Sequence, residues 1–194
     1  MKKLYSVSIL LILFSFSGTT MAQGLKLGLG GGLSIFSNGS SNFSYTAGYH
    51  VGAKIKLDIP LVPITPVAFV NYHFLNGTYD NSSLSVSYTQ KILSYGIGVE
   101  YSLLPGLVSP YLAIDLGFNN IAAGSGSFNL PAGFSSPVPS LSRTGLDIGA
   151  GAEVKIPFLF TLDGSIKYNM MNLLNKDSGE PNLSAVVINI SVLF

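Results

Sequence analysis

Several residue types and patterns are scarce in this chain. Cysteine is absent from its 194 residues, which excludes disulfide bonds, thiolate metal sites, cysteine nucleophiles and a lipoprotein anchor at a cysteine. Charge is sparse and balanced, with ten Lys and Arg against nine Asp and Glu. Nucleic-acid binding requires a basic patch, so we expect no nucleic-acid partner. The length suits a single domain.

Long apolar runs are also missing beyond the N-terminus, although hydrophobic residues make up 47% of the chain and the mean hydropathy is +0.47. A membrane-spanning helix needs about 20 consecutive apolar residues. Here the apolar residues instead alternate with polar ones. A membrane β-barrel requires this distribution, because successive side chains of its strands face lipid and lumen in turn.

The N-terminal residues 1–22 predict a secretory signal peptide. Lys2 and Lys3 form a basic segment, residues 4–16 form a short apolar core, and Ala22 ends a small-residue cleavage pattern. We expect cleavage after Ala22, which leaves residues 23–194 as one barrel domain. The alternative is a retained membrane anchor, for which the apolar core is short, since a spanning helix needs about 20 residues.

Eight stretches of the remaining chain alternate with the period of two that is typical of β-strands. They are residues 25–36, 45–58, 66–75, 88–103, 111–121, 143–156, 160–171 and 185–194. Compact connections with proline (59–65, 104–109 and 157–159) alternate with longer polar ones (37–44, 76–87, 122–142 and 172–183). Membrane barrels have short periplasmic turns and longer extracellular loops. We therefore predict an all-β fold, a closed eight-stranded antiparallel up-and-down transmembrane β-barrel.

The charged residues of these stretches share one face. When the apolar face of each strand is turned to lipid, the other face carries Lys26, Lys54, Lys56, Asp58, Glu100, Asp115, Arg143, Asp147, Glu153, Lys155, Asp163 and Lys167. Lys91 alone falls on the apolar face. A Lys or Arg that faces lipid costs about 2 to 4 kcal/mol at the midplane and about 0 to 1 kcal/mol near the interface.

The interior of an eight-stranded barrel is just wide enough for side chains to fill it. The inward set contains six cations and six anions, so we expect a neutral network of salt bridges that plugs the barrel. The alternative is a narrow ion path through gaps beside the inward glycines.

Candidate catalytic and metal-binding residues are few. His50 and His73 fall on the polar face of neighbouring strands. Neither has a Ser two residues away, as the lipid A deacylase barrels have in their Ser-His arrangement. No third ligand of suitable spacing accompanies the two histidines, so a metal site is not indicated. We expect both histidines to form ordinary interior hydrogen bonds, and we expect no enzymatic activity, cofactor or metal.

The final stretch, residues 185–194, is apolar at every second position and ends on an aromatic residue. Val186, Ile188, Ile190, Val192 and Phe194 share its apolar face. It resembles the terminal strand of bacterial outer-membrane barrels. In that family this strand pairs with the first and is read by the barrel assembly machinery, which would give Val192 and Phe194 that role here.

The whole mature chain is similar to the OmpA-like and OmpX-like small transmembrane barrels, described as the outer membrane protein beta-barrel domain family. The resemblance implies an integral protein of the outer membrane of a diderm bacterium, a monomer surrounded by outer-membrane lipids and lipopolysaccharide. It implies a structural role or an interaction of the extracellular loops with an unknown surface partner. The loop 122–142 is the best candidate for that contact. A narrow porin-like channel and a lipid A-modifying enzyme are the alternatives.

Overall fold

The computed structural model describes residues 24–38, 43–81, 84–122, 125–126, 141–157, 159–180 and 182–194. The predicted signal peptide and most of the predicted loop 122–142 lie outside the described residues. Within the described ranges, no helix is long and apolar enough to cross a membrane.

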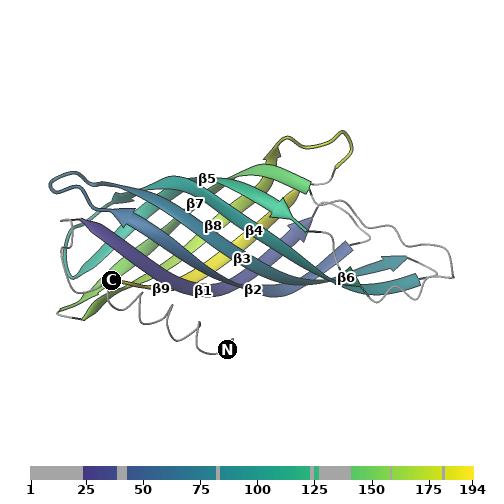
Figure 1. Ribbon diagram of the computed structural model, residues 1–194, viewed down its shortest axis with the longest axis horizontal. Helices are drawn as coiled ribbons and strands as arrows, with labels where there is room; N and C mark the ends of the chain where they lie inside the picture. The colour runs from purple at the N-terminus through teal and green to yellow at the C-terminus, as the bar shows by residue number, and fades with distance from the viewer. Residues whose placement is uncertain are drawn as a thin grey trace, which may run out of the picture.

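Eight long antiparallel strands form the wall of a barrel (Figure 1). They are β1 (Leu25–Asn38), β2 (Phe43–Leu57), β3 (Ile64–Asn81), β4 (Leu84–Ser102), β5 (Val108–Ile121), β7 (Leu141–Ile156), β8 (Phe160–Leu174) and β9 (Leu183–Leu193). Each strand pairs with its neighbours along the chain, and β1 pairs with β9 to complete the circle. The predicted closed, eight-stranded up-and-down barrel is confirmed.

The seam between β1 and β9 runs without a break from the pair Gly28 and Leu193 to the pair Asn38 and Leu183. The backbone of Phe194 extends it, because its N–H donates to the carbonyl oxygen of Leu27 at 2.8 Å and its own carbonyl accepts from the Leu27 N–H at 3.0 Å. The wall therefore has no free strand edge, which is a requirement in hydrocarbon, where water cannot satisfy backbone groups.

Strand β5 shows how alternation divides the two faces. Leu112, Ile114 and Leu116 point outward and are exposed, while Ala113 and Asp115 point inward and are buried. The outer surface is thus apolar and the interior contains many polar groups, the reverse of a water-soluble protein. This arrangement suits a wall surrounded by lipid.

The predicted loop 76–87 is wrong, because β3 continues to Asn81 and β4 begins at Leu84. The two strands stay paired to their tips and project past the ends of the other strands (Figure 1). A two-residue strand, β6 (Ser125–Gly126), adds to the outer part of β4. Alternation of apolar residues fades in this part of the sequence, since a hairpin beyond the bilayer has no lipid to face.

The seam places two backbones closer together than a side chain allows. A Cβ atom on Gly32 of β1 would lie 1.8 Å from the carbonyl oxygen of Ile188 on β9. At Gly164 of β8, by contrast, an added Cβ would meet nothing within 4 Å. Gly32 is therefore required for the strands to approach at the seam, and Gly164 is not.

We predict that Gly32→Ala destabilises the closed barrel by about 1 to 3 kcal/mol, because the added methyl group forces β1 and β9 apart. Urea titration in detergent micelles, followed by the different gel mobility of folded and boiled samples, measures the change. Gly164→Ala is the matched control and should leave the midpoint unchanged or slightly raised. Equal effects of the two substitutions would show that the seam is not the constraint.

Candidate functional site: the barrel interior

The interior side chains form three layers along the barrel axis. Lys56 and Glu100 lie near the ends of β2 and β4, beside the short turns, and mark a charged layer. Phe36 and Ala185 lie near the opposite end, beside the long loops, and mark an apolar layer. Histidine, serine and asparagine side chains lie between the two. Each layer is assembled from several strands, so it exists only in the closed barrel.

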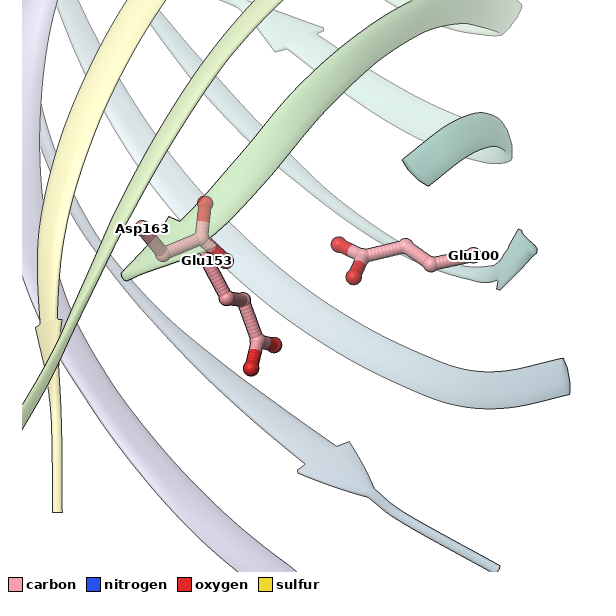
Figure 2. A group of neighbouring side chains, drawn as sticks. All are labelled: Glu100, Glu153 and Asp163. Atoms are coloured by element: carbon pink, nitrogen blue, oxygen red, sulfur yellow. The ribbon is translucent and has the colours of Figure 1, made fainter. Parts of the chain in front are cut away.

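The charged layer is centred on Lys56, whose side chain is 1% exposed. Its ammonium forms ion pairs with Glu100, Glu153 and Asp163, the last at 3.0 Å. These carboxylates come from β4, β7 and β8 and converge on one space (Figure 2). We call these four residues the lysine cluster.

Further contacts tie the lysine cluster to the surrounding wall. Lys54 binds Asp163 at 2.8 Å, and Lys26 binds Glu153 at 2.8 Å and Asp58 at 2.6 Å. The Tyr111 hydroxyl donates to Asp163 at 2.8 Å, and the tyrosine ring lies 4.7 Å from the ammonium of Lys56. Together with these contacts, the lysine cluster forms a network that links six strands across the lumen.

Three carboxylate groups within 4.8 Å of one another, as in Glu100, Glu153 and Asp163, could supply the oxygen ligands of a divalent cation. Here the Lys56 ammonium contacts all three, so it already occupies the position between them. Chemically the arrangement is a buried cluster of salt bridges.

The remaining predicted charges are not paired as the six-to-six balance suggested. Lys167 binds Asp115 at 2.5 Å. Lys155 is exposed beside a turn and has no ion pair among the described residues. Asp147 is buried, and the described chain offers it no ion-pair partner. Arg143 is buried as well but binds residues outside the barrel wall. The interior therefore holds more anions than cations.

Arg143 anchors the connection between β8 and β9. Its guanidinium donates to Glu180 at 2.9 Å and to Asp177 at 2.6 Å. Asn172 donates to Glu180 at 3.0 Å and accepts from the backbone N–H of Leu183 at 2.8 Å. We call this set the loop clamp. Sequence reasoning missed Asp177 and Glu180 because a polar connection has no periodicity that points to a partner.

The electrostatic effect of the loop clamp is concentrated on Glu180. Hydrogen bonding by the Arg143 guanidinium lowers the pKa of the Glu180 carboxyl to about 2. Asn172 acts in the same direction. The carboxylate therefore remains ionised far below the pH at which an ordinary glutamate takes up a proton.

The middle layer contains both histidines, as expected. The hydroxyl of Ser34 lies 3.0 Å from Nδ1 of His50 and 3.0 Å from Nδ1 of His73. Nε2 of His50 lies 3.2 Å from the side-chain oxygen of Asn189. Sequence spacing could not reveal Ser34 as their partner, because three different strands bring these residues together.

A Ser beside a His has the geometry of a nucleophile with its base. Two features oppose that function here. Ser34 is completely buried, at 0% exposure. The group behind His50 is the amide of Asn189, which cannot stabilise an imidazolium as a carboxylate does. The layer is a hydrogen-bonded support within the barrel.

The apolar layer was not predicted. Its members point inward from six strands and are buried, namely Phe36, Leu75, Ile92, Ile121, Met171, Ala185 and Val187. Leu75, Ile92 and Met171 are 0% exposed. In the sequence, each is an apolar residue on the otherwise polar face of a strand near its loop end. That displaced position is the signal that could have revealed the layer.

Three of the inward glycines, Gly96, Gly98 and Gly151, make room for large neighbours. Added Cβ atoms would lie 2.9 Å from the ring of Phe69 at Gly96, and 1.9 Å from the carboxylate of Asp115 at Gly98. At Gly151 the ring of Tyr111 would lie within 2.5 Å. At these positions the lumen is therefore filled by side chains that lie over glycine backbone on the next strand.

The family model of the outer membrane protein beta-barrel domain matches residues 8–194. Among solved structures, Neisserial surface protein A is 17% identical, with a TM-score of 0.59 over 88% of this chain and 97% of that one. OprG from Pseudomonas aeruginosa is 14% identical, with a TM-score of 0.57 over 88% and 96%.

A major outer membrane protein from Thermus thermophilus is 11% identical, with a TM-score of 0.57 over 88% of this chain and 98% of that one. None of the curated proteins matches the sequence. At these identities the similarity to the solved structures establishes the fold alone.

We predict that Lys56→Met destabilises the barrel by about 3 to 5 kcal/mol, because it leaves buried carboxylates without their shared cation. The urea midpoint followed by gel mobility measures the loss. Lys155→Met is the matched control, since Lys155 is exposed and has no ion pair among the described residues. It should leave the midpoint unchanged. A Lys56→Met barrel as stable as the wild type would contradict the central role of the lysine cluster.

The loop clamp predicts a pH dependence. Folding lowers the pKa of Glu180, so the unfolded chain binds this proton more tightly. The stabilisation is complete above the ordinary glutamate pKa of about 4.5 and is lost as the pH falls through about 2. An NMR titration of the Glu180 side-chain carboxyl carbon should give a midpoint near 2.

In the same titration, Arg143→Met should move the Glu180 midpoint up toward 4.5. Lys176→Met is a control from the same connection, because Lys176 binds Asn182 and not Glu180. A wild-type midpoint at the ordinary value, unaffected by Arg143→Met, would show that the clamp does not form in solution.

Proposed function

This chain belongs to the outer membrane protein beta-barrel domain family, and on that premise we propose that it is a non-conducting integral barrel that acts at the cell surface through its extracellular loops. Export through a cleaved signal peptide and insertion by the barrel assembly machinery, with Val192 and Phe194 in the recognised strand, belong to this proposal. So do a monomeric state and a surround of outer-membrane lipids and lipopolysaccharide.

The observation that carries the proposal is that two layers of opposite chemistry lie across the lumen, and we propose that they act as seals. At the turn end, the lysine cluster fills the cross-section with paired charges. At the loop end, the apolar layer offers no polar group to a hydrated ion. Hydrophobic constrictions exclude water and ions by dewetting. An ion would have to pass two barriers of opposite chemistry.

The narrow channel is the less favoured candidate. It relies on water-filled gaps beside the inward glycines, but the large side chains of Phe69, Asp115 and Tyr111 lie over Gly96, Gly98 and Gly151. A cavity of about 50 Å³ lies in the middle of the lumen, which has room for about four water molecules. Such a cavity between two seals is not a path.

Enzymatic activity is also outside the proposed function. The Ser34 and His50 pair is the arrangement nearest to a catalytic site in the described part of the chain, and it lies beneath the apolar layer. A lipid substrate in the outer leaflet cannot contact it. Catalysis needs the reacting group within hydrogen-bond reach of the nucleophile.

A surface role is supported by the order built into the loop end. Hairpin β3–β4 carries paired backbone beyond the rim of the barrel, and the loop clamp fixes the connection between β8 and β9. Binding loops that are held before contact lose less conformational entropy when a partner binds. We expect the partner to bind at the cell surface and not inside the barrel, because side chains occupy the lumen.

The proposal predicts that the purified protein gives no reproducible conductance steps in planar lipid bilayers. Opening the apolar layer alone with Leu75→Ala and Met171→Ala should also give none, because the lysine cluster remains. Combining these with Lys56→Ala and Glu100→Ala, which remove one charge of each sign, should produce steps.

Leu33→Ala with Ile190→Ala is the control for the loss of apolar side chains, because both residues face outward. When it is combined with Lys56→Ala and Glu100→Ala, this control pair should give no conductance steps. Every sample is first checked for folding by its gel mobility before and after boiling. Regular steps from the wild-type protein would overturn the closed barrel, and a silent four-residue variant would show that these two layers are not the seals.

A further inference from the structure

Three adjacent strands place oxygen-bearing side chains in one lateral row inside the barrel. Asp115 of β5 lies directly opposite Asp147 of β7, and Asp147 lies directly opposite Asn169 of β8. Opposed Cβ atoms in an antiparallel pair are about 4.5 to 5.5 Å apart. All three residues line the central cavity of about 50 Å³ and are at least nine-tenths buried.

Each member of this row has one oxygen atom without a hydrogen-bond partner in the described structure, namely Oδ1 of Asp115, of Asp147 and of Asn169. Nε2 of His73, which lines the same cavity, also has none. Buried polar groups are nearly always hydrogen-bonded, and each exception requires an explanation. Two of these acceptor oxygens, those of Asp147 and Asn169, belong to directly opposed residues that line the cavity, and they point to a positively charged occupant.

The charge count around the cavity gives the sign and the size of the missing charge. Lys167 neutralises Asp115 at 2.5 Å, and Lys54, which also lines the cavity, is bound to Asp163 at 2.8 Å. Asp147 is left without a counter-ion among the described residues. When Asp147 is ionised, one negative charge in the centre of the barrel therefore has no ion pair among the described residues, and an unpaired buried ion is costly.

We propose that the central cavity holds one small monovalent cation of the size of Na⁺ or K⁺, with Oδ1 of Asp147 and Oδ1 of Asn169 as its protein ligands. Oxygen atoms from carboxylate and amide groups suit a hard cation. The cavity has room for the ion and a few water molecules that complete its coordination. A single positive charge balances Asp147, whereas a divalent ion would leave an excess.

The two layers on either side of the cavity determine how the ion reaches it. Because the cavity lies between the lysine cluster and the apolar layer, we expect the ion to be taken up as the barrel closes during folding. The site is therefore a structural one and does not depend on the proposed surface role. It also supplies a counter-ion to Asp147, which forms no ion pair among the described residues.

The test is to refold the full mature chain into detergent micelles with Na⁺, K⁺ or the bulky cation N-methyl-D-glucamine as the only cation, at equal ionic strength. The wild type should melt about 5 °C higher in at least one of the small cations than in N-methyl-D-glucamine. Asp147→Asn, which removes the charge, should lose this difference. Asn169→Ala, which leaves the net charge unchanged, should lose it too.

Asp58→Asn is the matched control, because Asp58 is a partly exposed acid at the turn end, with 38% side-chain exposure, and should retain the cation dependence. Crystals of wild-type protein refolded with Tl⁺ should show an anomalous peak between Asp147 and Asn169. Equal melting temperatures in all three cations, with no such peak, would overturn the proposal. Higher stability of Asp147→Asn in every cation would also overturn it, since Asp147 would then hold a proton instead.

Discussion

The structure depends on one constraint, which is that every backbone hydrogen bond of the wall must be made within the wall. The seam of β1 and β9 meets it from Gly28 to Asn38, and the backbone of Phe194 adds the last two bonds to Leu27. An unsatisfied backbone group in hydrocarbon costs several kcal/mol. Closure thus fixes the arrangement of the strands around the barrel, and this arrangement determines which side chains meet in the lumen.

Closing eight strands leaves a lumen that must be filled by side chains from opposite walls. The protein fills it by placing a large residue on one strand over a glycine on the next, as Phe69 lies over Gly96. The charged layer then needs its partners at short distance, and Lys56 finds them on three other strands. Filling and charge pairing are therefore one requirement.

The filled interior directs attention to the loop end for function. There the long hairpin and the loop clamp hold chain in defined positions beyond the rim. The solved barrels with similar folds establish architecture only, because their sequences are at most 17% identical to this one.

The sequence by itself determined the strands of the wall, their number and the face each side chain occupies, because a period of two is local and every residue carries it. It therefore placed Lys56, Asp115 and Asp163 inside. It did not determine which interior side chains contact one another. The tertiary structure decided three features: the binding of Arg143 to Glu180, the lack of an ion pair at Asp147 among the described residues, and the apolar layer around Leu75. Contacts across a lumen depend on strand register and barrel closure, which are not properties of any single strand.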